Sequence, residues 1–368
     1  MLKNAIGLII ADDRRITIGD LSRHRALGAI PFGGRYRVID FILSNYVNTG
    51  IYTIGVSTFM KYRSLMDHLG TGSAWDLDRK NQGLHILPPN IGVEAYNGSG
   101  DDIAGIWDFY RDFKQDYIII SSCHTIYNMT YEDLLQSHID SKSDITVMYN
   151  NDGIDFGTPN TILDLDRRKR VKGVYQNPDK PISNRSSMDT IVMSRELFID
   201  ILGGMIAQGQ RDFGIATLIY MFDDLKVSGF EYKGVALRIN SLQSYFSETM
   251  RTLEDPVRKV LFYGSNPIFT KVKDEAPAYY NDSCIVDNSL ISDGCTIMGL
   301  TKNSLLFRGV TLSGQSKLIN CIVFQDSFIS EGCELENVII DKDAVIRPGT
   351  KLIGNANYPI VIGKGAIV

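Results

Sequence analysis

Residues 322–352 read IVFQDSFISEGCELENVIIDKDAVIRPGTKL, and this stretch decides the fold of the C-terminal part of the chain. An apolar residue returns every six positions within it, as at Val323, Ile329 and Leu335. Turn-forming residues stand between these positions, as at Glu331 and Gly332. A period of six predicts a coil with three short strands, each pointing one apolar side chain inward, and such coils stack into a parallel β-helix.

The same period extends back to residue 285 and forms four triplets. The step is six within each triplet, and equivalent positions of successive triplets lie 21, 17 and 17 residues apart. We therefore expect four extra residues in a loop near residues 300–303, and a left-handed β-helix of hexapeptide repeats. The alternative, an antiparallel β domain, would alternate with a period of two. The twelve predicted inward positions are Ile285, Ile291, Ile297, Leu306, Leu312, Leu318, Val323, Ile329, Leu335, Ile340, Ile346 and Leu352.

The N-terminal part alternates apolar strand-like runs with helical patterns, which predicts an α/β domain with a mostly parallel sheet. We divide the chain into this domain over residues 1–255, a linker over 256–281 and the β-helix domain over 282–368. The expected strands cover residues 6–10, 53–56, 117–120 and 145–149, and the expected helices cover 38–48, 103–115, 132–141 and a connector over 241–262.

Composition excludes several classes of protein. The chain has 368 residues, 44% of them hydrophobic, and a formal net charge of −5, which argues against a general nucleic-acid binder. No apolar run is long enough to span a membrane. The five cysteines form no CxxC pair, so the sequence predicts neither a disulfide framework nor a zinc site, and we expect a reduced cytoplasmic location.

A dense basic run occupies residues 167–172, which read RRKRVK, between two short strand patterns. We interpret it as the solvated tip of a hairpin. The alternative is a contact with an anion or with a partner.

An active site of an open α/β sheet is expected beyond the carboxyl ends of its strands. The loop after the first strand contains Asp12 and Asp13 but no glycine. A phosphate-binding loop needs glycines so that backbone N–H groups can approach the anion.

The next segment carries a resemblance to a known family. Residues 31–41 read PFGGRYRVIDF and residues 43–51 read LSNYVNTGI. Both strings are similar to the N-terminal segment of ADP-glucose pyrophosphorylases, the glucose-1-phosphate adenylyltransferases. Together with the hexapeptide repeats, the resemblance covers essentially the whole chain. It implies an α/β nucleotidyltransferase domain with a Rossmann-like, mixed sheet. It also implies a reaction that converts ATP and glucose 1-phosphate into ADP-glucose and pyrophosphate, with Mg²⁺ held by two aspartates.

The chain departs from the family pattern at the positions that bind the metal and the phosphates in that reaction. The two positions of the metal-binding aspartates align with His124 and Arg238, and the lysine that contacts the sugar phosphate aligns with Asn177. Leu27 replaces a lysine near the nucleotide phosphates. Mg²⁺ prefers hard oxygen ligands, so we expect no intact catalytic residue, no metal and no cofactor here. The family positions that still resemble binding residues are Gly98, Ser99 and Asp212, with Asn177 as a changed fourth.

The resemblance therefore points to a degenerate, GlgD-type regulatory subunit. Such a chain pairs with a catalytic homologue, and we expect a hetero-oligomer, a tetramer in particular, with self-association as a further option. The residues that could bind a sugar-phosphate or phosphate effector are Arg23, Arg25, Arg35 and Arg37. The alternative for these residues is a solvated basic patch or structural ion pairs.

The sequence leaves two other functions as alternatives. A weakly active adenylyltransferase is the alternative enzyme, and the lost metal positions argue against it. An acyltransferase of the β-helix type would place a catalytic histidine in a coil, and residues 281–368 contain no histidine.

Overall fold

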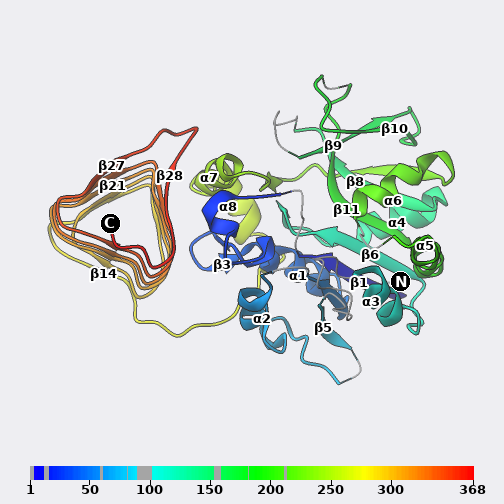
Figure 1. Cartoon of the computed structure of the whole chain (residues 1–368), viewed down its shortest axis with the longest axis horizontal. Coiled ribbons are helices and arrows are strands. Elements are labelled where there is room, and N and C mark those ends of the chain that lie inside the picture. The colour runs from blue at the N-terminus through cyan, green and yellow to red at the C-terminus, as the bar shows by residue number, and fades with distance from the viewer. Residues whose placement is uncertain are drawn as a thin grey trace.

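The computed structural model describes residues 4–11, 16–58, 61–80, 82–88, 102–152, 159–180, 182–210 and 214–368. Its N-terminal domain is built on a nine-stranded mixed sheet (Figure 1). Four strands run parallel at its centre and one edge, as is typical of strands that are joined through helices. They are β1 (Ala5–Ile10), β4 (Thr53–Ser57), β5 (Gly83–Leu87) and β6 (Tyr117–Ser122).

The other half of the sheet changes direction at β11 (Ser186–Ser194), which is antiparallel to β6. This change makes the sheet mixed, as the family resemblance implies. The remaining strands are β8 (Ile145–Asn150), β9 (Thr161–Leu165), β10 (Val171–Gln176) and β12 (Val227–Glu231). Short pairs are formed by β2 (Pro31–Phe32) with β3 (Tyr36–Arg37) and by β7 (Thr125–Ile126) with β13 (Leu237–Arg238).

Helix α1 (Val38–Asn48) has the predicted limits, and Gly50 follows it with a φ of +82°, a conformation that favours glycine. Helix α3 (Asp102–Tyr110) is shorter than the expected 103–115. The carbonyls of Arg111 and Gln115 accept hydrogen bonds from the Arg195 guanidinium instead of continuing the helix. The other helices are α2 (Arg63–Leu69), α4 (Glu132–Ser141), α5 (Arg195–Ala207) and α6 (Ile215–Ile219), with single turns η2 (Gly19–Ser22), η3 (Leu27–Ala29), η4 (Ser73–Trp75) and η6 (Tyr220–Asp223).

The expected connector over 241–262 is two helices, α7 (Leu242–Arg251) and α8 (Asp255–Phe262). The break lies just before Pro256, which sits in the first turn of α8. Proline lacks an N–H group and disfavours helical geometry in the residue before it, so one continuous helix cannot run through this position.

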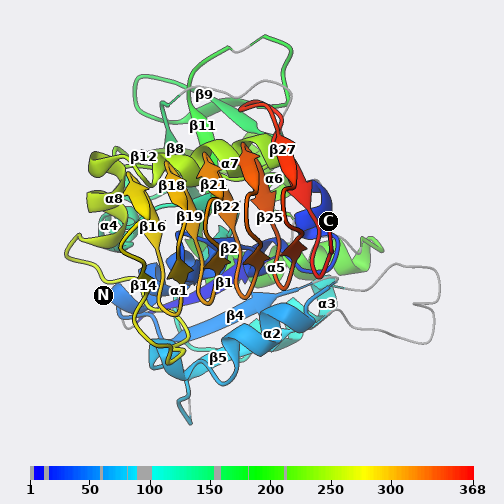
Figure 2. The same ribbon diagram turned by 90° about the vertical axis from the view of Figure 1, so that its left-hand side faces the viewer.

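The C-terminal part is a left-handed β-helix of three parallel sheets (Figures 1 and 2). The first sheet contains β14 (Tyr279–Tyr280), β17 (Thr296–Ile297), β20 (Thr311–Leu312), β23 (Phe328–Ile329) and β26 (Val345–Ile346). The second contains β15 (Ile285–Asp287), β18 (Leu300–Lys302), β21 (Lys317–Ile319), β24 (Glu334–Glu336) and β27 (Lys351–Ile353). The third contains β16 (Leu290–Ile291), β19 (Leu305–Leu306), β22 (Ile322–Val323), β25 (Val338–Ile340) and β28 (Ile360–Ile362).

Two details of the predicted register are wrong. Residues 300–303 form no extra loop, because strand β18 occupies this side and Thr301 points inward, fully buried, in register with Leu318. The predicted period was traced through apolar residues, and it passed over position 301 because threonine is polar. Ile285 is 59% exposed, and its neighbour Val286 is the residue in register with Thr301. The long corner of the β-helix lies between β27 and β28 instead.

The third sheet of the β-helix packs against the N-terminal domain and shares a hydrophobic core with it. Phe324 lies edge-on to Phe307, with ring centroids 5.1 Å apart, and to Tyr245 of α7, at 6.4 Å. Tyr245 in turn donates a hydrogen bond to the carbonyl of Pro31. The two domains are therefore joined by packed apolar side chains and not by a linker alone.

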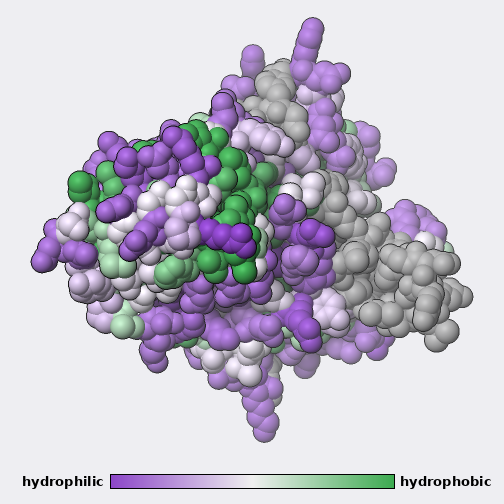
Figure 3. All heavy atoms as spheres, turned by 60° about the vertical axis from the view of Figure 1, so that its left-hand side comes forward, coloured by the Kyte–Doolittle hydropathy of each residue, from purple (hydrophilic) through white to green (hydrophobic). Residues whose placement is uncertain are grey.

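The last coils of the β-helix leave apolar side chains at the surface. Ile353 is 56% exposed, Tyr358 81% and Ile367 62%. Figure 3, which brings the β-helix side of the molecule forward, shows apolar patches among hydrophilic residues on this surface. None of the helices in the described ranges is long and apolar enough to cross a membrane.

Candidate functional site

His124 and Arg238, the residues at the two expected metal positions, lie on neighbouring segments. His124 follows the carboxyl end of β6, and Arg238 is on β13, opposite Thr125 of β7. The N–H of Ile239 donates a 2.7 Å hydrogen bond to the carbonyl of His124, which holds the two segments together. Positions more than a hundred residues apart in the sequence are thus brought side by side at the carboxyl edge of the sheet.

The His124 imidazole is buried, and both of its ring nitrogens have partners. Nδ1 is hydrogen-bonded to Ser122 Oγ at 2.6 Å, and Nε2 lies 3.2 Å from a carboxylate oxygen of Asp189. Ser187 Oγ donates to the other carboxylate oxygen of Asp189 at 2.9 Å. The ring is therefore fixed between a hydroxyl and a carboxylate.

Sequence reasoning missed Asp189, although a signal exists. Asp189 is the one carboxylate in the buried run SSMDTIVMS of β11, and a buried charge needs a partner. Its φ of +46° is rare for a residue with a side chain, and the pairing of β11 with β8 shifts register around it. The irregular backbone turns the carboxylate toward His124.

Arg238 is tied to the same strand. One of its terminal nitrogens donates to Ser186 Oγ and the other to the carbonyl of Ser187 at 2.7 Å. Burial lowers the pKa of Arg238, and the negative charges of Asp189 and Asp152 act in the opposite direction. The guanidinium remains the positive charge of this site, because arginine stays protonated in proteins.

The described residues at this place do not fit Mg²⁺. A guanidinium has no lone pair to offer a metal, and the imidazole nitrogens already have partners. No group of three or more His, Cys, Asp or Glu side chains in the described ranges is arranged to hold a metal ion.

Asn177 belongs to the same site. It lines one small hollow together with His124 and Asp189, about 20 Å³ in volume, which leaves room for about one water molecule. Asn177 Oδ1 accepts a hydrogen bond from the N–H of Asn160 at 2.8 Å. The other predicted binding residues, Gly98, Ser99 and Asp212, lie outside the described residues.

The four predicted effector arginines have different surroundings. Arg23 and Arg35 are exposed, and the Arg35 guanidinium lies over the Tyr36 ring, 5.9 Å from its centroid. Arg25 is buried, and its Nη2 donates to both carboxylate oxygens of Asp341 on the β-helix at 2.9 Å. The Arg25 Nη1 atom is buried without a hydrogen-bond partner.

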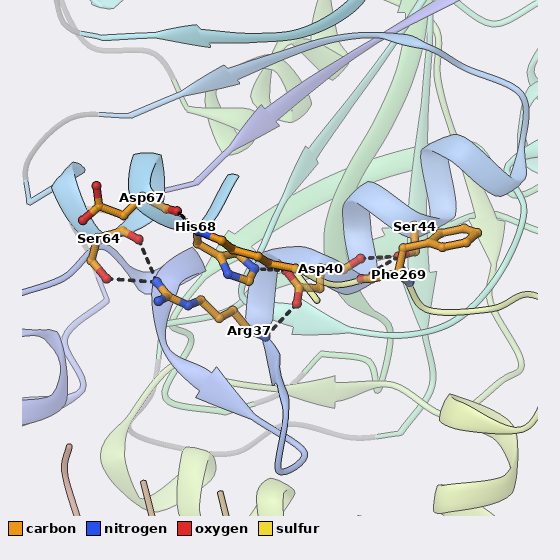
Figure 4. A network of polar contacts seen from close by, with 8 residues as sticks. Arg37, Asp40, Ser44, Ser64, Asp67, His68 and Phe269 are labelled. Atoms are coloured by element: carbon orange, nitrogen blue, oxygen red, sulfur yellow. Dashed lines mark hydrogen bonds and ion pairs between the residues drawn. The ribbon is translucent and has the colours of Figure 1, made fainter. Parts of the chain in front are cut away.

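Arg37 is positioned by a network at the start of α1 (Figure 4). Its Nη1 donates to the carbonyl and the hydroxyl of Ser64 at 2.7 and 2.9 Å, and its N–H donates to Asp40 at 2.9 Å. The other carboxylate oxygen of Asp40 lies 2.6 Å from His68 Nε2. Burial lowers the pKa of Arg37 to about 10. The network holds Arg37 through its backbone N–H and through one guanidinium nitrogen, Nη1.

Lys342, which follows Asp341 in the β-helix, completes a cationic cluster at the domain boundary. Burial and the nearby guanidinium groups of Arg37 and Arg25 lower the pKa of Lys342 to about 7. We call Arg25, Arg37 and Lys342 the boundary cluster. Carboxylates lie near both arginines of this cluster. Asp341 pairs with Arg25, and the negative charges of Asp40 and Asp67 act on Arg37. Asp341 is the one carboxylate that acts on the pKa of Lys342. Sequence reasoning missed Asp341 and Lys342, because a pair 316 residues apart leaves no local pattern.

Comparisons with known proteins agree with this architecture. A family model described as nucleotidyl transferase matches residues 18–233, and one described as GlmU-like, C-terminal hexapeptide matches residues 276–357. The chain is 34% identical to the "Glycogen biosynthesis protein GlgD" of Bacillus subtilis (strain 168) over 98% of its own length and 96% of that protein.

Two further relatives carry the name "Glucose-1-phosphate adenylyltransferase". The protein of Bacillus mycoides (strain KBAB4) is 29% identical, and that of Bacillus cereus (strain ATCC 14579) is 28% identical. Each match covers 98% of this chain and 97% of the relative.

Proposed function

The chain belongs to the glucose-1-phosphate adenylyltransferase family of nucleotidyl transferases, and from this membership we propose that it serves glycogen biosynthesis as a regulatory subunit without significant turnover of its own. Its partner is a catalytic homologue of the same family. The two chains form a hetero-oligomer, a tetramer in our proposal, in which this chain changes how the partner responds to effectors.

One observation carries the proposal. At the expected metal positions, an imidazole and a guanidinium are held by Ser122, Asp189, Ser186 and Ser187. Transfer of the adenylyl group of ATP to glucose 1-phosphate, with pyrophosphate leaving, needs a cation that screens the phosphates in the transition state. A guanidinium that is bonded on both terminal nitrogens cannot follow the phosphates as they react. This arrangement supports a folded, inactive domain rather than an altered enzyme.

The boundary cluster supports the regulatory part. Its cations come from both domains, so an anion bound there touches the N-terminal domain and the β-helix together. A phosphate or sugar phosphate would remove the charge repulsion between Lys342 and the two arginines, and arginine is suited to phosphate by its planar donor fork. Its coupling to the partner would be of the order typical for allostery, about 1–3 kcal/mol.

The test is a pyrophosphate-release assay with ATP, glucose 1-phosphate and Mg²⁺. It compares this protein alone, the catalytic homologue from the same cell alone, and the mixture, each with and without inorganic phosphate. We expect no turnover by this protein alone and a changed rate or phosphate response in the mixture. The Lys342→Met variant should still associate with the partner but lose the phosphate response, whereas Lys302→Met, an exposed cation on another sheet, should behave as the parent protein.

Turnover by this protein alone that is lost in Asp189→Asn would show that the chain is an active adenylyltransferase. An unchanged rate and an unchanged phosphate response in the mixture, with no complex by light scattering, would rule out the regulatory function.

A further inference from the structure

The hairpin that joins β9 to β10 carries an unusual concentration of positive charge. Arg167, Arg168, Lys169 and Arg170 form its tip, and Lys172 follows on β10. We call these five residues the cationic tip. All five are exposed, on a chain whose net charge is −5. The hairpin stands at the edge of the nine-stranded sheet and away from the β-helix in Figure 1, and it projects from the body in Figure 2.

The backbone of the tip is fixed. Asp166 accepts hydrogen bonds from the N–H groups of Arg168 and Arg170 at 2.7 and 2.9 Å, so its carboxylate is used to hold the turn. These bonds lower the pKa of Asp166. The carbonyl of Lys169 accepts from the N–H of Gly229 at 2.7 Å, which ties the tip to β12. A surface held in this way loses little freedom when it binds a partner.

The charges of the tip are not neutralised within the described part of the chain, where none of the five forms an ion pair with an acidic side chain. Several cations elsewhere on the surface have such partners. Arg111 pairs with Asp108, Arg251 with Glu248, Lys259 with Asp255, and Lys351 with Glu334. The tip differs from these four sites because it gathers in one hairpin five cations that are unpaired within the described ranges.

The geometry points to a docking surface for a carboxylate-rich segment of a partner protein, and we propose that function for the cationic tip. The occupant follows from charge: the tip carries five cations against the single carboxylate of Asp166 in its turn, so an excess of positive charge is left for an acidic partner. Arg167, Arg168 and Lys172 line an open surface hollow of about 490 Å³, together with Leu165 and Asp166. This inference does not depend on the proposed regulatory function.

The experiment uses the full chain and a short fluorescent poly-L-glutamate peptide as the probe, with binding followed by anisotropy. The test variant carries Arg167→Gln, Arg168→Gln, Arg170→Gln and Lys172→Gln and keeps Lys169, whose φ of +61° the turn requires. The control variant carries Arg111→Gln, Arg251→Gln, Lys259→Gln and Lys351→Gln. Both variants lose four positive charges, so net charge cannot explain a difference between them.

We expect the parent protein and the control to bind the probe alike at low salt, and the test variant to bind at least about 10-fold more weakly, from four exposed charge pairs. Binding of the parent should weaken as the Debye length shortens with added salt. Equal affinity of both variants, or no binding by the parent, would overturn the proposal. Tighter binding of a single-stranded DNA probe than of poly-L-glutamate would overturn it as well, because the tip would then be a nucleic-acid contact.

Discussion

At the scale of single residues, the two sites differ in how their charges are balanced. His124 and Arg238 are satisfied by hydroxyl, carbonyl and carboxylate groups within reach. The boundary cluster is not, since Arg25 keeps a buried nitrogen without a partner and Lys342 has a lowered pKa. A buried donor without a partner can still donate a hydrogen bond to a ligand. The boundary cluster is therefore where we propose that a small anion acts.

Lys342 gives a prediction about pH. Its pKa falls from 10.5 to about 7 on folding, so the folded state binds fewer protons than the unfolded state between those values. The contribution of Lys342 to stability should therefore rise from pH 7 to pH 10. A bound anion favours the charged lysine, so sulfate, which does not titrate here, should raise the melting temperature more at pH 6.5 than at pH 8.5.

The measurement is thermal unfolding with and without sulfate at both pH values. The pH-dependent part of the sulfate effect should disappear in Lys342→Met and persist in Lys302→Met. An equal sulfate effect at both pH values in the parent protein would contradict the prediction.

Thr301 gives a prediction about stability. It is fully buried in the inward column of the β-helix, and its hydroxyl oxygen has no hydrogen-bond partner. Thr301→Val keeps the shape and removes the unsatisfied hydroxyl, so we expect a gain of about 1 kcal/mol in the free energy of unfolding. Thr146→Val is the control, because the Thr146 hydroxyl pairs with His138 and Ser228 and its loss should be destabilising. Denaturant midpoints compare the two, and a destabilised Thr301→Val would show that the hydroxyl is used.

At the scale of elements, the corners of the β-helix explain why its coils stack in register. Asn303, Asn320 and Asn337 occupy one corner of successive coils with φ values of +46°, +52° and +52°. The side chain of Asn320 donates to Asn337 at 3.3 Å, and that of Asn337 donates to the carbonyl of Gly354 at 3.2 Å. Asparagine tolerates this left-handed backbone and bridges the coils as well.

This double role is testable at Asn320. Asn320→Ala should cost about 1–2 kcal/mol, because alanine is strained at positive φ and cannot bond the next coil. Asn320→Gly relieves the strain and loses only the hydrogen bond, so it should cost less. Chemical denaturation of the two variants separates the cost of backbone strain from the cost of the lost hydrogen bond. Equal losses of unfolding free energy in both variants would mean that the backbone conformation contributes nothing.

Elements with strong local patterns were predictable from the sequence, and contacts between distant elements were not. The inward positions of the β-helix follow an apolar period, so they were predicted except where Thr301 is polar and where the first coil shifts by one residue to Val286. His124 and Arg238 were predicted as site positions from the family pattern. Asp189 was not predicted. Its side chain reaches His124 because the backbone of β11 is irregular at this residue, and the alternation of a regular strand gives no sign of such an irregularity.

At the scale of the whole molecule, the two domains behave as one structural body. The hydrophobic core continues from the N-terminal domain into Phe307 and Phe324 of the β-helix, and the Arg25–Asp341 pair lies beside it. We expect one cooperative thermal transition, with equal calorimetric and van't Hoff enthalpies. Two separate transitions in scanning calorimetry would show that the domains unfold independently.

The Arg25–Asp341 pair can be tested in the same instrument. Removal of one partner from a buried pair typically costs about 3–5 kcal/mol, so Asp341→Asn should lower the midpoint of the single transition. Asp343→Asn changes a carboxylate two residues away that is 55% exposed and should have little effect. A stability of Asp341→Asn equal to that of the parent would mean that the pair does not hold the domains together.

The position of that pair also matters while the protein is being made. Arg25 leaves the ribosome early, and Asp341 follows 316 residues later. At about 5–20 residues per second, the arginine waits roughly 15 to 60 seconds for its carboxylate. During that interval the N-terminal domain carries an unpartnered cation and an uncovered apolar face. A nascent chain in this state is a target for chaperones. The speed of translation through the β-helix sets the duration of this exposed state.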